Sequence, residues 1–168
     1  MDILDRLLEH DAAATRDLLA LCQALPHEQW RTTFDFGQGS LYDTLDHMID
    51  SQEYWTSLMR GEPGPFTPAP PDPARGPQSL LRRFEAVSPV FIAVSRQIRD
   101  EGRLEDTFLD IETGPARRTF GACIVHVATH NMHHRAQARV MFDLLGVEYN
   151  PIAGFAMDAH PPNAGDIP

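Results

Sequence analysis

The stretch TFGACIVHVATHNMHHRAQARVMFDLL, residues 119–145, decides the fold of this 168-residue chain. Along it, apolar residues recur every three or four positions, and Gly146 follows the last of them. On a helix that turns by about 100° per residue, these residues fall within one arc, which marks a buried face. The stretch therefore predicts one long amphipathic helix that ends at Gly146.

Three further stretches show the same helical spacing: residues 2–25, 41–60 and 79–102. Pro26 ends the first of these helices, and Ser40 is a good N-cap for the second, which closes at Gly61. Ser79 can cap the third helix, and Pro89 inside it predicts a kink or a break. Together with residues 119–145, these stretches predict four long helices.

The segments between the helices are predicted to be irregular, with one exception. Seven of the fourteen prolines lie in residues 63–77, which predicts an extended surface loop long enough for a crossover between helices. Between residues 103 and 118, apolar and polar side chains alternate before a Thr-Gly-Pro turn signal, which favours a short hairpin. Residues 147–168 show no pattern and are predicted to form an irregular C-terminal tail.

The whole chain, residues 1–168, is expected to form a single all-α domain. Four long helices bury their apolar stripes most simply against one another, which predicts a four-helix bundle. The long proline-rich connection leaves room for a crossover, so the bundle need not have simple up-down topology.

Composition excludes several classes of function. The net charge of −10 argues against binding to nucleic acid, which requires an excess of basic residues. No apolar run approaches the ~20 residues needed to span a bilayer, so we expect no membrane partner. All fourteen cationic residues are arginine, which excludes Schiff-base and Walker-type lysine chemistry. Two cysteines are too few for a disulfide scaffold and no signal peptide is recognisable, which favours a cytoplasmic protein.

The histidines are the strongest indication of chemistry. Four of the eight lie on the last predicted helix, and His47 lies on the second. On the helical wheel, His130 and His134 fall within or beside the buried arc, whereas His126 and His133 point away from it. An i, i+4 pair of histidines on one face can bind a divalent ion. A stable site needs a third ligand, and His47, at the edge of its own apolar arc, is the best-placed candidate.

Other interpretations of this pair are weighed against a metal site. The two histidines can also be core or boundary residues with ordinary hydrogen-bond partners. A di-iron bundle would need paired Glu-x-x-His motifs, which the predicted helices lack. A zinc protease would need a glutamate where Asn131 stands, since an amide cannot take a proton. The chain also lacks the Gly-x-Ser-x-Gly elbow of a serine hydrolase.

Two parts of the sequence resemble the signature stretches of the DinB/YfiT-like family, the DinB superfamily. They are LYDTLDHM at residues 41–48 with EYW at residues 53–55, and HVATHNMHHRAQ at residues 126–137. The resemblance extends from the first helix to about Gly146. Ala136 is one departure, because the family usually has glycine after the arginine. Alanine is small and a better helix former, so little disturbance is expected.

This resemblance implies a four-helix bundle with up-down-down-up connectivity, commonly a homodimer. It also implies one divalent metal ion on His47, His130 and His134, the same inward pair that the helical wheel selects. Zinc is the first expectation for the ion, with nickel or iron as alternatives, because imidazole suits all three.

Five further residues are candidates for supporting roles. His126 matches a common family position and is interpreted as a residue that supports the ligands or the structure. Arg135 and Gln137 are candidates for similar roles. Tyr54 and Trp55 could form the wall of a pocket, although aromatic residues at helical spacing more commonly belong to the core.

Three neutral imidazoles would leave an ion its full charge and an open coordination position, as in catalytic sites. Relatives within the family include S-transferases and isomerases that use mycothiol, bacillithiol or glutathione. The resemblance therefore favours a metal-dependent, low-molecular-weight-thiol-dependent S-transferase that acts on a small-molecule substrate in detoxification or stress response. The alternatives are a metal-dependent hydrolase and a non-catalytic, metal-stabilised dimeric protein with a binding or stress-related role.

Overall fold

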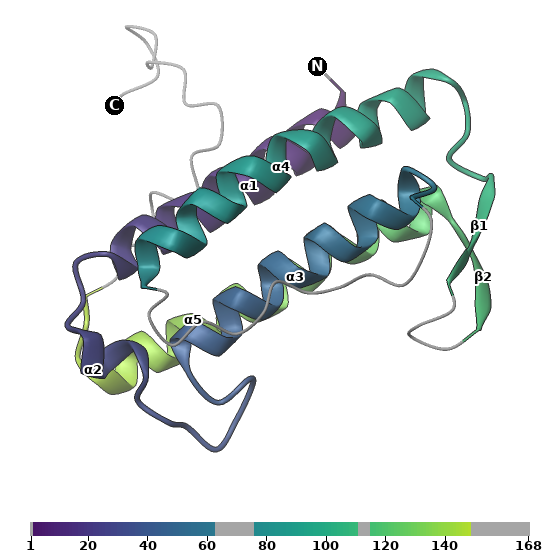
Figure 1. The fold of residues 1–168 in the computed structure, drawn as a ribbon. Coiled ribbons are helices and arrows are strands. Elements are labelled where there is room, and N and C mark those ends of the chain that lie inside the picture. Colours follow the sequence, from purple (N-terminus) through teal and green to yellow (C-terminus); the bar gives the residue numbers. More distant parts are fainter. Residues whose placement is uncertain (1, 63–75, 111–114, 149–168) are drawn as a thin grey trace, which may run out of the picture.

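The structure is a computed structural model that describes residues 2–62, 76–110 and 115–148. Its elements follow the chain in the order α1 (Ile3–Cys22), α2 (His27–Trp30), α3 (Leu41–Met59), α4 (Pro77–Asp100), β1 (Thr107–Asp110), β2 (Ala116–Thr119) and α5 (Phe120–Leu145). The four long helices pack as a bundle, with the two strands at one end and the single turn of α2 at the other (Figure 1). The predicted all-α four-helix bundle is therefore confirmed.

The bundle has two layers, α1 with α4 and α3 with α5 (Figure 1). Side-chain contacts fix the directions of the helices. Leu45 and Leu80, early in α3 and α4, share one core cluster, and Trp55 and Ile98, late in the same helices, share the other, so α3 and α4 run parallel. Leu8 of α1 likewise lies in one cluster with Phe120 at the start of α5, and Leu18 lies in the other with Ala138. With α1 parallel to α5 and both opposed to α3 and α4, the connectivity is up-down-down-up.

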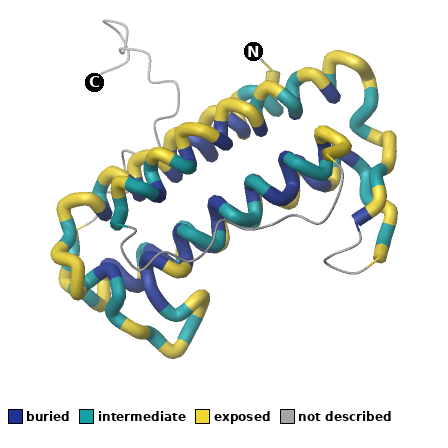
Figure 2. The backbone as a smooth tube through the Cα atoms, in the orientation of Figure 1, coloured by how far each residue is buried: buried dark blue, intermediate teal, exposed yellow. Residues whose placement is uncertain are grey.

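The buried residues of each layer face those of the other layer (Figure 2). Capping residues set where the functional helices begin. Ser40 Oγ accepts a hydrogen bond from the Asp43 backbone N–H at 3.1 Å, which confirms the predicted N-cap of α3. Gly146 follows α5 with a φ of 68°, a left-handed conformation that glycine adopts without strain.

Helix α4 differs from the sequence prediction at two points. It begins at Pro77, not at Ser79, because proline is tolerated in the first turn of a helix, where its missing N–H is not needed. Pro77 thus belongs to the helix and not to the predicted loop. The helix also continues through Pro89 without a break. Pro89 is exposed, so water can satisfy the carbonyl that loses its intrahelical partner.

The short hairpin before the last helix is confirmed. Strands β1 and β2 pair antiparallel, with Thr107 opposite Thr119 and Asp110 opposite Ala116. Residues 111–114 between them lie outside the described residues, as do residues 63–75 of the predicted loop and 149–168 of the predicted tail.

Two features of the first part of the chain were not predicted. Helix α1 ends at Cys22, three residues earlier than expected, and α2 is too short to show a helical period. Trp30 at the end of α2 is buried, and its indole N–H donates to the Cys22 carbonyl at 2.8 Å. Among the described helices, none combines the length and the apolar character needed to cross a membrane.

Candidate metal centre

Three imidazole rings converge between α3 and α5. His130 Nε2 lies 3.1 Å from His47 Nε2 and 3.1 Å from His134 Nε2. The ligand atoms of all three residues lie within 4.8 Å of one another. The three residues that the sequence analysis selected as metal ligands are therefore brought together by the fold.

The helices explain why these side chains meet. His130 and His134 are four residues apart on α5, so they project from one face on consecutive turns. His47 faces them from α3, which runs antiparallel to α5. His134 is buried and the other two rings are half-buried, so the cluster lies at the edge of the core.

The donor chemistry of the cluster fits a metal ion. A neutral imidazole carries one N–H and one lone pair, and His130 Nε2 faces two other ring nitrogens at once. It cannot donate one proton linearly to both of them. The buried Nδ1 atom of His130 also has no hydrogen-bond partner among the described residues. A cation held by the three Nε2 lone pairs would remove the conflict at His130 Nε2, while His130 Nδ1 would keep its proton.

Gln137 determines how His134 presents its lone pair. The Gln137 Oε1 atom accepts a hydrogen bond from His134 Nδ1 at 2.8 Å, while Gln137 Nε2 donates to His133 Nε2 at 3.0 Å. A proton on Nδ1 leaves the His134 Nε2 lone pair directed at the other two histidines. The predicted supporting role of Gln137 thus has a structural basis.

The loop before α3 packs against Gln137. Gly37 has a φ of 61°, and a Cβ atom added at this position would lie 3.0 Å from Gln137 Oε1. The absence of a side chain therefore allows the loop backbone to approach the amide closely. This contact links the conformation of the loop to the orientation of His134.

The environment keeps the cluster uncharged at neutral pH. Burial, together with the nearby His134 and His47, lowers the pKa of His130 to about 4. Burial also lowers the pKa values of His47 and His134. Neutral imidazole is the form that binds metal ions, so the histidines are competent ligands without first losing protons.

An ion-pair cluster lies beside His47. Arg83 of α4 donates to Asp46 at 2.6 Å, to Asp50 at 2.5 Å and to Glu53 at 2.6 Å, all on α3. Asp50 and Asp46 oppose the lowering of the His47 pKa, but they do not overcome the effect of burial. The three carboxylates are engaged by one guanidinium group, which ties α3 to α4 behind the histidines.

Arg135 lies on a different side of α5 from His130 and His134. It donates to the carboxylate of Asp11 and to Thr15 Oγ1 at 2.9 Å, both on α1. Asn131 Nδ2 donates to the same carboxylate at 2.8 Å. The structure thus shows Arg135 connecting helices, not contacting the ligands. The contact between Asp11 and Asn131 was not predicted, although a carboxylate on the apolar stripe of the first helix was a usable signal.

A cavity of about 550 Å³ lies next to the histidine cluster. It is lined by Trp55, Arg117, Arg118, Thr119, Ala122, Cys123 and His126. The His126 ring lies 5.4 Å from the Trp55 ring and 5.6 Å from the His130 ring, centroid to centroid. Trp55 is therefore both a core residue and a wall of the cavity. Tyr54 is buried behind it, and its hydroxyl donates to Asp110 Oδ1 at 2.6 Å.

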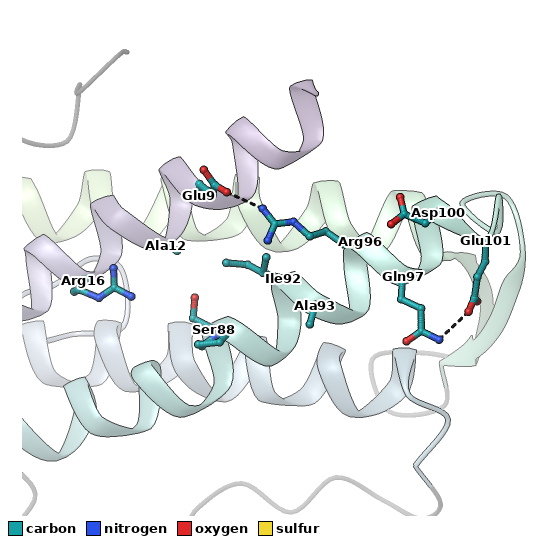
Figure 3. Close-up of a pocket in the computed structure, with 11 residues that line it drawn as sticks. Glu9, Ala12, Arg16, Ser88, Ile92, Ala93, Arg96, Gln97, Asp100 and Glu101 are labelled. Carbon is teal, nitrogen blue, oxygen red and sulfur yellow. Dashed lines mark hydrogen bonds and ion pairs between the residues drawn. The ribbon is translucent and has the colours of Figure 1, made fainter. Parts of the chain in front are cut away.

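A larger cavity of about 800 Å³ lies between α1 and α4, on the other layer of the bundle (Figure 3). No histidine is among the described residues that line it, and several of its polar side chains bond to one another. Arg96 donates to Glu9 at 2.7 Å, and Gln97 donates to Glu101 at 2.8 Å. This cavity is separate from the metal centre.

Comparisons with known proteins agree with this architecture. The model of the DinB superfamily matches residues 10–138. A DinB-like protein from Bacillus cereus has a similar structure, with a TM-score of 0.65, 15% sequence identity and coverage of 84% of this chain and 90% of that one. A protein from Exiguobacterium sibiricum assigned to the DinB family aligns with a TM-score of 0.56 and 17% identity, over 89% and 97% of the two chains. At these identities, the two structures show a shared fold. No curated protein matches the sequence.

Proposed function

The chain belongs to the DinB superfamily, and we propose that it is a cytoplasmic, metal-dependent S-transferase that uses a low-molecular-weight thiol. Family membership and the three-histidine cluster are compatible with a metal-dependent enzyme. The substrate would be an electrophilic small molecule, and the physiological role would be detoxification or stress response. Zinc is the proposed ion, with nickel or iron as alternatives.

The observation that carries this proposal is the convergence of three neutral Nε2 atoms at the edge of the core. Three uncharged ligands leave a divalent ion its full positive charge, whereas cysteinate or carboxylate ligands would partly neutralise it. When bound, such an ion would act as a Lewis acid that favours the thiolate form of a thiol at neutral pH.

The residues of the chain would position the thiol and take up its proton. His126 lines the cavity beside the cluster, and burial and the charge of Arg118 lower its pKa. Its imidazole is therefore neutral and can accept the thiol proton. Neither cysteine is suited to replace the cosubstrate. Burial raises the pKa of Cys123 to about 12 and that of Cys22 further, so both remain protonated thiols.

The carboxylates near the cluster are not free to act as a general base, which leaves His126 as the base for either thiol transfer or hydrolysis. A hydrolase needs a general base to activate water, and carboxylates commonly serve in this role. Asp46 and Asp50 are the carboxylates whose charges act on His47. Both are bonded to Arg83. The proposal is tested against two alternatives. One is a metal-dependent hydrolase, and the other is a non-catalytic protein that the metal stabilises.

The test uses metal-loaded protein with glutathione, mycothiol or bacillithiol. Titration calorimetry should show that one of these thiols binds the loaded protein but not the metal-free protein. The sulfur of that thiol should then displace chloride from chlorodinitrobenzene. This reaction should be faster with metal-loaded wild type than with metal-loaded His126→Gln. If none of the three thiols binds, thiol transfer is contradicted. Ester cleavage by the same preparation would then support a hydrolase.

We also propose that the chain forms a homodimer through the outer face of α5. Four apolar side chains are exposed along this helix, at fractions of 54% for Val125, 60% for Met132, 48% for Val140 and 64% for Leu144. Their spacing places them within one arc of about 120° on the helix, which His126 and His133 share and beyond which the ligand candidates His130 and His134 lie. Exposed apolar side chains that recur along a helix in this way are typical of an interface, and a second copy of the same face is its simplest partner.

A further inference from the structure

The cavity beside the histidines is lined by two arginines in a strongly acidic protein. The chain carries a net charge of −10, yet the described lining residues include two arginines and no carboxylate. Arg117 and Arg118 come from β2, and Trp55 contributes the opposite wall from α3. Asp110 matches the charge of Arg118, so Arg117 supplies the excess positive charge that would attract an anion.

Arg118 is held in place from behind. Its Nε–H donates to Asp110 Oδ2 at 2.6 Å, and Asp110 is fully buried, with 0% of its surface exposed. The other oxygen of this carboxylate accepts the Tyr54 hydroxyl at 2.6 Å. The Arg118 guanidinium group also lies 5.8 Å from the centre of the Trp55 ring. These contacts fix Arg118 against the aromatic wall of the cavity.

Arg117 brings a charge that is not matched by a carboxylate. Its Nε–H donates to the hydroxyl of Thr107 at 3.1 Å, which is a neutral partner. Within the described part of the chain, no carboxylate lies at ion-pair distance from Arg117. Arg117 is exposed and is one of the residues that line the cavity, so an anion that reaches its side chain would not displace an ion pair among the described residues.

We propose that this cavity binds the carboxylate of a small organic acid, with Arg117 and Arg118 as its anion-binding residues. The body of the acid would lie on the Trp55 ring, because an aromatic face favours a flat, unsaturated group. A cavity of about 550 Å³ has the size of a small-molecule site. The inference rests on the proposed function, since it makes the electrophilic substrate an unsaturated or aromatic carboxylic acid whose other end approaches His126 and the metal centre.

The test is titration calorimetry of the metal-free full-length protein with benzoate, acetate, benzamide and inorganic phosphate. Benzoate should bind at least about tenfold more tightly than benzamide, because a charge-assisted hydrogen bond is lost with the neutral amide. It should also bind more tightly than acetate, which lacks a ring for Trp55. Arg117→Gln should weaken benzoate binding about tenfold. Arg82→Gln, a change of another exposed arginine on α4, should leave it unchanged.

Three results would overturn the inference: equal binding of benzoate and benzamide, benzoate binding that Arg117→Gln does not weaken, or no saturable benzoate binding. Phosphate binding as tight as that of benzoate would instead identify a phosphate site and contradict the organic acid. Because the protein is metal-free, failure of the metal centre does not affect this readout. If benzoate does not bind the metal-free protein, but a separate metal-loaded preparation holds its ion, only the anion site is refuted.

Discussion

At the scale of single residues, the metal centre depends on groups that do not themselves contact the ion. His134 is oriented by Gln137, and Gln137 is in turn packed against Gly37. Hydrogen-bond partners of this kind fix the tautomer of a ligand, and their loss typically weakens metal binding about 10- to 100-fold. The sequence pattern pointed to Gln137 as a supporting residue, but it could not reveal Gly37, because the loop contact is long-range.

Gly37→Ala tests this chain of contacts. The new Cβ atom would lie 3.0 Å from Gln137 Oε1 and would also force alanine into a left-handed conformation, at a cost of about 1–2 kcal/mol. We expect lower thermal stability and weaker metal binding, measured by competition with a chelator. Gly61→Ala is the matched control, because Gly61 has a φ of 68° with nothing within 4 Å. It should lose stability alone, and equal metal affinity in the two variants would contradict the role of Gly37.

The pKa of His130 gives a pH dependence with a defined sign. Its pKa is about 4 in the folded protein and about 6.5 in an unfolded chain. Between these values, only the unfolded state takes up the proton, so the metal-free protein should lose stability as the pH falls from about 6.5 to about 4. Urea denaturation across this window should show a smaller loss in His130→Gln. Identical pH profiles for wild type and variant would show that His130 is not perturbed by its surroundings.

At the scale of elements, polar networks determine how the helices are rotated against one another. Asp11 is buried, and burial raises its pKa while Arg135 and Asn131 oppose this effect. Since Asn131 and Arg135 flank the inward histidines on α5, their contacts to α1 set the face that α5 presents to α3. Helical periodicity predicted the long helices, but not α2, whose single turn is fixed by a hydrogen bond from Trp30 to Cys22.

Asp11→Ala should therefore be costly. It would leave the guanidinium group of Arg135 without its carboxylate in a mostly buried place, and losing one partner of a buried ion pair costs about 3–5 kcal/mol. Asp17→Ala removes an exposed carboxylate from the same helix and should change stability by less than about 0.5 kcal/mol. Urea denaturation of both variants compares them directly. Similar unfolding free energies would show that the network does not hold α1 to α5.

At the scale of the whole molecule, amphipathic periodicity predicted the bundle and its hairpin because both features follow from local spacing. The sequence predicted a kink or a break at Pro89, and helix α4 shows no break, since a proline on a solvated helix face leaves the carbonyl that loses its partner to water. The helical wheel selected His130 and His134, whereas the position of His47 opposite them depends on helix packing. The cavity was beyond sequence reasoning, because β2, α3 and α5 form it together.

The assembly of the whole molecule is tested on the exposed face of α5. Met132→Asp places a charge at the centre of the apolar stripe, where 60% of the side chain is exposed in the single chain. Light scattering should show a dimer for wild type and a monomer for this variant, with the helical content unchanged. Val90→Asp, at an exposed apolar position on α4, should remain dimeric. A monomeric wild type, or a Met132→Asp variant that stays dimeric, would contradict the proposed interface.

Three histidines from two helices are proposed to form one metal centre. Elemental analysis of protein purified without a His tag tests it most directly, alongside His47→Ala and His133→Ala. We predict about one divalent ion per chain in wild type and in His133→Ala, and none in His47→Ala. No metal in wild type after reconstitution, or equal losses in the two variants, would show that the converging histidines do not hold an ion.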